Sequence, residues 1–236
     1  MRVRTAAALA TAGFVAHAAP SVTALPPVRR RVAPAWHAVG APGHVALTFD
    51  DGPDPVSTPR VVDELDRLGV KATFFMLGSM VRLSPGLAAE VAAAGHEVAV
   101  HGDVHVSELW RSPGAVVTDL LRARDAVAHA TGSTPRWFRP PYGIVSSAGP
   151  VAARRAGLRL VLWTTWGRDW RAAATPSSVV ADVSRDLCDG ATVLLHDSDC
   201  TSDPGAWRAA VGALQPLTEL VRARGWRIGP LAEHGL

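Results

Sequence analysis

The stretch that decides the fold is HVALTFDDGPDPVSTPRVVDELDRLGVKATFFML, residues 44–77. An apolar run over residues 44–49 leads into a polar turn, and a helical segment then opens at Thr58-Pro59 and closes at Gly69. Pro suits the first position of a helix, where its missing N–H would be unpaired anyway, and Gly suits the helix exit because it tolerates a left-handed backbone. A second apolar run follows over residues 71–77. The stretch therefore predicts a strand, a helix and a second strand, which is the repeating unit of parallel sheets.

The same pattern of Pro at helix starts and Gly at helix ends continues to the C-terminus. Pro opens further helical segments at positions 85, 113, 150, 176 and 204, and Gly closes segments at positions 95, 132, 157, 190 and 225. Apolar runs follow at residues 97–101, 136–140, 158–165, 191–197 and 227–231. Near-continuous apolar runs are expected of strands that are covered on both faces. Seven such strands predict a single α/β domain, a distorted (β/α)7 TIM-like barrel, with a doubly wound open sheet as the alternative.

Composition narrows the class of protein. The 236 residues are 48% hydrophobic and 19% charged, with a formal net charge of +3, which is typical of one folded domain. The basic cluster at residues 29–31 lies outside any recognisable nucleic-acid-binding pattern, so no nucleic-acid partner is expected. We expect the protein to be a monomer.

The N-terminal part is expected to be a targeting segment. Residues 1–18 combine a short basic start, a weakly apolar stretch and small residues at 16–18, which predicts a signal peptide or an N-terminal apolar leader. Residues 19–43 are rich in Pro and Arg and are expected to be a connector, which leaves residues 44–236 as the folded domain. The predicted location is extracellular or the cell envelope, or cytoplasmic or membrane-associated if the leader is retained. Peripheral association with a membrane or a cell wall stays open.

The two cysteines of the chain relate to the predicted export. Cys188 and Cys200 could form a disulfide in an exported protein. They flank a predicted strand, however, and a strand of six residues separates its ends by roughly 20 Å. A bridge is therefore left open.

Polar residues stand at five predicted strand exits. These exits carry Asp50-Asp51, His101, Arg139, residues 163–169 and His196-Asp197. Catalytic residues of a parallel βα barrel lie where the strands run into the following loops. The five exits therefore predict one site at one end of the barrel.

The segment HGDVH, residues 101–105, is the first candidate for metal binding. In a helical turn, His101 and His105 would lie on the same face. Two imidazoles and one carboxylate of the Asp50-Asp51 pair would leave an open position on the metal, as in catalytic zinc sites. The second carboxylate could then act as a general base. The alternatives are structural histidines and a solvated turn at Asp51-Gly52.

Three further residues could complete a hydrolytic site. Arg139 could orient a carboxylate base through a bidentate pair, and the backbone N–H of Tyr142 could stabilise an oxyanion. His196 could act as a general acid with Asp169 as its partner. The alternatives are a surface arginine in an ordinary turn and a structural histidine at a strand end.

Five ordered motifs resemble those of the polysaccharide deacetylase family, the fourth family of carbohydrate esterases. They are TFDDGP (48–53), HGDVH (101–105), RPPYG (139–143), DW (169–170) and LLHD (194–197). The resemblance covers about residues 44–231 and implies a distorted seven-stranded βα barrel. It also implies a metal-dependent hydrolase that removes N-acetyl groups from amino sugars of a polysaccharide, oligosaccharide or glycoconjugate and releases acetate. An O-acetyl esterase acting on acetylated glycans and a non-catalytic carbohydrate-binding relative are the alternatives.

The resemblance implies a role for each matching residue. Asp50 would be the general base, oriented by Arg139, and the Tyr142 N–H would stabilise the oxyanion. The implied ligands of Zn²⁺, or of another divalent cation such as Co²⁺, are Asp51, His101 and His105. His196, tuned by Asp169, would protonate the leaving amine, and Trp170 and Leu194 would line the pocket for the acetyl methyl group.

The chain departs from the family pattern at two positions. Gly102 stands where a Ser or Thr is usual, so a hydroxyl that would brace the metal loop is missing. Trp166 stands where an acid often precedes Asp169 by three residues. With Trp163 and Trp170 it makes this loop aromatic, which favours either a carbohydrate-binding wall that contacts the substrate or core packing.

Overall fold

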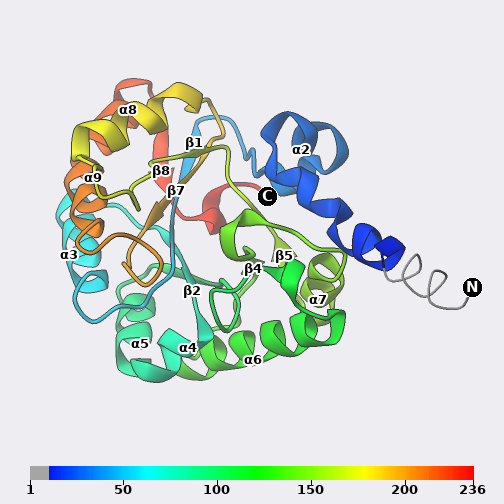
Figure 1. The fold of residues 1–236 in the computed structure, drawn as a ribbon. Coiled ribbons are helices and arrows are strands. Elements are labelled where there is room, and N and C mark those ends of the chain that lie inside the picture. The colour runs from blue at the N-terminus through cyan, green and yellow to red at the C-terminus, as the bar shows by residue number, and fades with distance from the viewer. Residues whose placement is uncertain (1–10) are drawn as a thin grey trace, which may run out of the picture.

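A curled parallel sheet forms the centre of the molecule and is covered by helices on its outside (Figure 1). The computed structural model describes residues 11–236, so the part of the predicted leader over residues 1–10 lies outside the described residues. The strand order is β5-β4-β3-β2-β1-β7-β6, with β8 paired to β1, and all pairs are parallel. The predicted distorted (β/α)7 barrel is therefore confirmed. The strands are β1 (His44–Asp50), β2 (Thr73–Met76), β3 (Glu97–Val100), β4 (Trp137–Phe138), β5 (Arg159–Leu160), β6 (Thr165–Trp166), β7 (Thr192–His196) and β8 (Arg227–Gly229).

The helices alternate with the strands as the Pro and Gly punctuation predicts. Each of the helices α3, α5, α6, α7 and α8 has Pro within its first two positions. The helix predicted to open at Asp203-Pro204 instead begins at Trp207, because the Asp199 carboxylate holds residues 205–207 in a turn by accepting from the backbone N–H groups of Gly205 and Trp207. The covering helices are α3 (Thr58–Leu68), α4 (Gly78–Leu83), α5 (Pro85–Ala93), α6 (Pro113–Thr131), α7 (Gly149–Arg155), α8 (Pro176–Asp186) and α9 (Trp207–Ala223).

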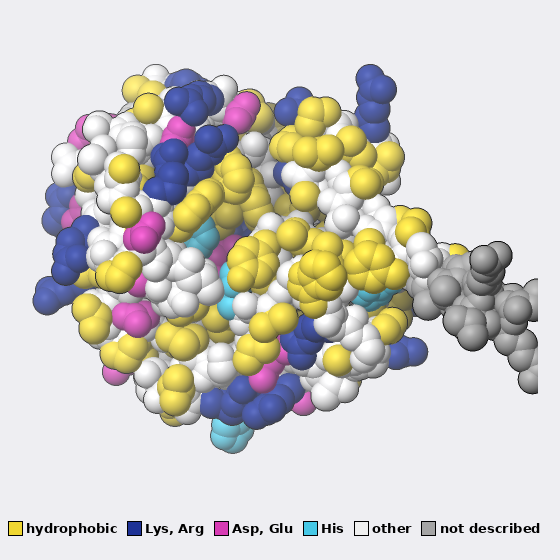
Figure 2. All heavy atoms as spheres, in the orientation of Figure 1, with side chains coloured by type: hydrophobic (Ala, Val, Ile, Leu, Met, Phe, Trp, Pro, Cys, Tyr) yellow, Lys and Arg dark blue, Asp and Glu magenta, His cyan; other side chains and the backbone are white. Residues whose placement is uncertain are grey.

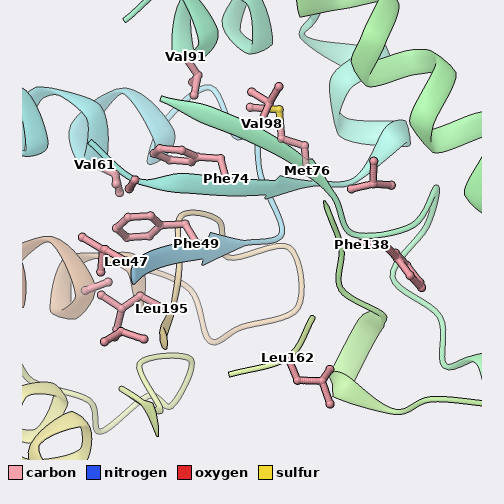
Figure 3. Close-up of a cluster of buried hydrophobic side chains, with 14 of the residues drawn as sticks. Leu47, Phe49, Val61, Phe74, Met76, Val91, Val98, Phe138, Leu162 and Leu195 are labelled. Atoms are coloured by element: carbon pink, nitrogen blue, oxygen red, sulfur yellow. The ribbon is translucent and has the colours of Figure 1, made fainter. Parts of the chain in front are cut away.

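The core lies between the strands and these helices. Phe49 of β1 and Phe74 of β2 stack with their ring centroids 5.1 Å apart (Figure 3). Val61 of α3 and Val91 of α5 reach the same cluster from the helix side. All four side chains are at most 1% exposed, so one side of these apolar runs forms the core between the sheet and the helices. Other residues of the runs, among them Phe75 and Trp137, form a second, smaller cluster.

One predicted strand is divided in two. The run over residues 158–165 forms β5 and β6, which lie at opposite ends of the strand order. The backbone between them leaves the sheet, and the Leu162 N–H donates to the carbonyl oxygen of Trp36 at 2.9 Å. Residues 161–164 therefore cross the gap between the two sheet edges, and we call this segment the seam.

The predicted connector is more ordered than expected. Residues 19–43 contain η1 (Ala19–Ala24), α2 (Pro26–Val32) and η2 (Pro34–His37), packed against the seam. Arg29 is fully buried because its guanidinium donates to the carbonyl oxygens of Thr23 and Trp163 and to His37 Nδ1. Within residues 11–236, no helix is long and apolar enough to cross a membrane. Cys188 and Cys200 are both free thiols.

Candidate active site

A cavity of about 310 Å³ opens at the carboxyl ends of the strands. Figure 2 shows this hollow on the face of the molecule, with histidine side chains at its bottom. The five strand exits predicted from the sequence all contribute to it. The lining residues are Asp50, His101, His105, Tyr142, Gly143, Trp163, Trp166, Trp170, Leu194, His196 and Thr201.

The two adjacent aspartates at the end of β1 have different partners. Asp50 accepts a hydrogen bond from Arg139 Nη1 at 2.7 Å, whereas Asp51 faces the two histidines. Asp51 has a φ of +84°, an unusual backbone conformation for a residue with a side chain. Gly52 follows because a Cβ there would lie 2.1 Å from Asp197 Oδ2. The turn thus directs two neighbouring carboxylates to separate tasks.

Asp51, His101 and His105 meet the geometric requirement for a divalent cation. Asp51 Oδ1 lies 3.3 Å from Nε2 of His101 and 3.3 Å from Nε2 of His105. Ligands of tetrahedral zinc are separated by about 3.3 to 3.5 Å when their bonds are 2.0 to 2.1 Å long. Asp51 Oδ1 is buried and has no hydrogen-bond partner among the described residues, as expected of an atom reserved for a metal. The three residues therefore fit such an ion.

The protonation states also suit metal binding. His101 Nδ1 lies 2.8 Å from the carbonyl oxygen of Arg139, which can only accept, so the proton is on Nδ1 and the lone pair of Nε2 faces Asp51. Burial and the neighbouring His101 lower the pKa of His105 to about 4, which leaves this ring neutral at pH 7. Burial alone would raise the pKa of Asp51, but the adjacent His101 and the charge of His196 hold that pKa well below its usual range.

Arg139 is a fully buried anchor for Asp50. Its Nη1 donates to Asp50 at 2.7 Å and to Thr48 Oγ1 at 2.9 Å, and its Nη2 donates to the Leu162 carbonyl at 2.9 Å. Contact with Asp50 is through a single nitrogen, so the bidentate pair considered from the sequence is not formed. Arg139 instead ties the base candidate to the seam.

His196 and Asp169 form the predicted pair. The Asp169 carboxylate accepts from His196 Nδ1 at 3.0 Å and from the His196 backbone N–H at 2.7 Å. Burial would lower the pKa of His196, but the charge and hydrogen bond of Asp169, with the nearby Asp51 and Asp50, raise it to about 10. His196 is therefore protonated at neutral pH, and it lines the cavity.

Aromatic residues cover one side of the cavity. The ring centroid of Trp166 lies 5.7 Å from that of Trp163 and 5.0 Å from that of Trp170. Trp170 in turn packs edge-on against His196. All three are partly exposed, and Trp163 also packs on the core, so core packing holds in part and the carbohydrate-binding wall stays a prediction. Leu194 completes an apolar corner.

Tyr142 also lines the cavity. Its ring packs edge-on against His105 with centroids 4.3 Å apart, and its φ of +61° places the backbone in the left-handed region. Gly143 follows because a Cβ there would lie 2.5 Å from the Trp163 ring. The RPPYG turn is thus wedged between the metal-binding candidate and the tryptophan wall.

The structure shows how the chain accommodates Gly102. Its φ of +94° favours glycine, and a Cβ there would lie 3.2 Å from Asp119 Oδ2. Asp119 accepts from the Asp103 N–H at 2.8 Å and so holds the loop in place of the missing hydroxyl.

Sequence reasoning missed Thr201. Its hydroxyl donates to Asp51 Oδ2 at 2.6 Å from the loop after β7. A threonine four residues past the LLHD motif has no local pattern that could reveal this contact.

Comparisons with known proteins agree with this geometry. The polysaccharide deacetylase family model matches residues 38–161. A chitooligosaccharide deacetylase of Bradyrhizobium sp. (strain ANU 289) is 38% identical over 197 residues, covering 80% of this chain and 89% of that protein. A peptidoglycan-N-acetylglucosamine deacetylase of Listeria monocytogenes is 40% identical over 153 residues, which are 65% of this chain but only 32% of that longer protein. A solved peptidoglycan N-acetylglucosamine deacetylase superposes with a TM-score of 0.78 at 25% identity, covering 87% of this chain and 95% of that one. The chain belongs to the polysaccharide deacetylase family.

Proposed function

We propose that the protein is a metal-dependent hydrolase that removes N-acetyl groups from amino sugars of a glycan and releases acetate. The main support for the proposal is that Asp50 and Asp51, neighbours at the end of β1, contact different partners. Asp51 faces two imidazoles that can share a cation, while Asp50 is held by Arg139 beside the same cavity. A protonated His196 lies on the same cavity and can serve the leaving group.

The metal would be held by Asp51, His101 and His105. A divalent cation such as Zn²⁺ or Co²⁺ would supply Lewis-acid chemistry, polarising the acetyl carbonyl and lowering the pKa of a water molecule. The donor set of one carboxylate and two imidazoles is suited to Zn²⁺.

The remaining steps belong to the side chains of this chain. Asp50 would take a proton from the attacking water, since a carboxylate fixed by Arg139 presents its second oxygen to the cavity. The Tyr142 N–H would donate to the developing oxyanion. His196 would then give its Nε2 proton to the leaving amine, while Asp169 keeps Nδ1 protonated. Trp170 and Leu194 would enclose the acetyl methyl group, and Trp166 would extend this apolar wall.

The substrate class follows from the relatives. The names of the similar proteins specify chitooligosaccharide and peptidoglycan N-acetylglucosamine, so we propose a glycan that contains N-acetylglucosamine. Export to the cell envelope or to the outside of the cell is proposed as well, because peptidoglycan, the substrate named for one of these relatives, lies there. Acetate release should be measured on N-acetylglucosamine oligomers, peptidoglycan and acetylated xylan with added Zn²⁺ or Co²⁺. Release from xylan alone would favour the O-acetyl esterase, and metal binding without release from any substrate would favour a non-catalytic relative.

Two substitutions test the assigned roles. Asp50→Asn should abolish acetate release and retain the metal, because Asp50 is assigned to the water and not to the cation. His101→Ala should lose both, because it removes a ligand. Elemental analysis of the purified variants, alongside acetate release, separates the two. Loss of metal from Asp50→Asn would contradict this division of roles.

A further inference from the structure

The segment over residues 19–43 exposes apolar side chains and buries polar ones. The polar side chains that it buries are Thr23, Arg29 and His37. The large apolar side chains of Val22, Leu25 and Val32 are instead 51%, 59% and 64% exposed. A helix on the surface of a globular protein normally turns its apolar face to the core and its polar face to water. The inverted pattern is therefore typical of a binding surface.

Arg29 is the cause of the inverted pattern. Its guanidinium donates to a backbone carbonyl of the seam at 2.7 Å and so turns the polar side of α2 inward. Leu25, Val28 and Val32 are spaced by three and four residues, so they lie along one side of α2, and Arg31 borders that side. Figure 2 shows hydrophobic side chains gathered over α2 with Lys or Arg side chains beside them. We call this surface the α2 patch, and its exposed members are Val22, Leu25, Arg30, Arg31 and Val32.

The α2 patch is held firmly on the barrel. Arg29 also donates to the Thr23 carbonyl at 2.9 Å and to His37 Nδ1 at 3.3 Å, so η1, α2 and η2 share one buried anchor. The Trp36 carbonyl accepts from the Leu162 N–H at 2.9 Å. A surface that is ordered before binding loses less conformational entropy when it binds. The patch is therefore presented in one conformation.

The segment that carries the patch is basic and contains no acid. The first acidic residue of the chain is Asp50. Every exposed residue between positions 19 and 42 is Ala, Val, Leu, Pro or Arg. Arg30 and Arg31 therefore have no carboxylate in their own segment to neutralise them. A partner with negative charge and an apolar component would complement the patch.

The surface of a membrane that contains anionic lipid has both properties. Apolar side chains enter the boundary between headgroups and acyl chains, and basic side chains meet the lipid phosphates. A nucleic acid or an anionic wall polymer would bind through the arginines alone, because phosphate charge dominates such binding. The exposed apolar side chains would then have no role.

We propose that the α2 patch binds the surface of a membrane that contains anionic lipid. Val22, Leu25 and Val32 enter the boundary below the headgroups, and Arg30 and Arg31 contact the phosphates. Of the two peripheral associations that the sequence leaves open, the patch selects the membrane. It begins after the predicted leader, so it is present whether or not residues 1–18 are retained. It shares no residue with the cavity, so the proposal is independent of the proposed activity.

Co-sedimentation of the full chain with vesicles tests the proposal. The protein should bind vesicles that are about one third phosphatidylglycerol in phosphatidylcholine more tightly than vesicles of phosphatidylcholine alone, because each arginine near an anionic surface strengthens binding by about 5-fold. Arg30→Gln combined with Arg31→Gln should therefore weaken binding to the mixed vesicles roughly 30-fold. Leu25→Ser combined with Val32→Ser should weaken it roughly 10-fold or more, because less apolar surface leaves water.

Two pairs of substitutions elsewhere on the surface are matched controls. Arg60→Gln combined with Arg208→Gln removes the same charge from exposed positions on α3 and α9, which lie across the molecule from α2 (Figure 1). Val56→Ser combined with Leu83→Ser removes equivalent apolar side chains that are 66% and 78% exposed. Both controls should bind nearly as the unmutated protein does. All variants carry the same residues 1–18, so differences among them report on the α2 patch.

Several results would overturn the proposal. These are absence of binding to the mixed vesicles, equal binding to phosphatidylcholine alone, or equal effects of the patch variants and their controls. Binding that needs Arg30 and Arg31 but not Leu25 and Val32 would indicate a polyanion in place of a membrane. A dimer in analytical ultracentrifugation that Leu25→Ser with Val32→Ser converts to a monomer, without vesicle binding, would assign the patch to a second copy of the chain.

Discussion

Thr201 fixes the orientation of Asp51, the carboxylate proposed to bind the metal. Its hydroxyl occupies Oδ2 at 2.6 Å, so Oδ1 alone is presented to the two histidines. Cys200 Sγ lies 3.7 Å from the Asp51 carbonyl oxygen, so the same loop contacts both the backbone and the side chain of this residue. A partner of this kind around a metal ligand usually contributes to affinity as well as to orientation.

Thr201→Val should weaken metal binding, because it removes the hydrogen bond to Oδ2 and preserves the shape of the side chain. We expect the dissociation constant for Zn²⁺ or Co²⁺ to rise about 10-fold or more, as is usual when such partners are removed. Competition with a chromophoric chelator measures it. Thr201→Ser keeps the hydroxyl and should bind nearly as the unmutated protein does. Equal affinities for the Val variant and the unmutated protein would show that Asp51 does not need this contact.

Two buried arginines hold the backbone of the seam, residues 161–164, in place. Arg29 donates to the Trp163 carbonyl at 2.7 Å, and Arg139 donates to the Leu162 carbonyl at 2.9 Å. One arginine comes from α2 and the other follows β4, so the gap between β5 and β6 is closed by side chains and not by a strand pair. Trp163, which belongs to the seam, also lines the cavity.

Arg29→Leu should destabilise the fold, because it leaves the carbonyl oxygens of Thr23 and Trp163 without their buried donor. We expect the free energy of unfolding to fall by about 2 to 4 kcal/mol, since each unsatisfied buried group costs about 1 to 3 kcal/mol. Urea denaturation measures the change. Arg30→Leu is the control, because the neighbouring Arg30 is exposed. Similar losses in both variants would contradict a specific role for Arg29.

At the scale of the whole molecule, buried histidines make stability depend on pH. Burial is the main cause that lowers the pKa of His37, His96 and His234 to about 4, with Arg29, Lys71 and His44 respectively adding to it. His37 Nδ1 accepts from Arg29, and His96 Nδ1 accepts from the Ala72 N–H, which requires a neutral nitrogen. In the unfolded chain these rings have a pKa near 6.5.

The free energy of unfolding should therefore fall as the pH is lowered from about 6.5 toward 4. In this window these three histidines bind more protons in the unfolded state than in the folded state, so their contribution to stability is full above pH 6.5 and is lost on acidification. Each histidine contributes a slope of up to about 1.4 kcal/mol per pH unit. Urea titrations at several pH values measure the slope, and His96→Asn, which keeps an acceptor for Ala72, should reduce it. A constant free energy between pH 7 and pH 5 would contradict this account.

Much of the architecture was predictable because its signals are local. Pro59 and Gly69 mark helix ends within a few residues, and barrel geometry then brings His101 and His196 to one end without further information. The seam, the packing of residues 19–43 and the Thr201 contact were not predictable. Each depends on a polar group meeting a partner more than 100 residues away, and neither partner carries a periodic pattern.

The N-terminal segment has a consequence for synthesis of the protein. Arg29 emerges early from the ribosome, but its acceptor Trp163 follows 134 residues later. At 5 to 20 residues per second this interval lasts roughly 7 to 27 s. During this time the segment has no seam to dock on, so residues 19–37 stay undocked until the strands up to β5 have been synthesised.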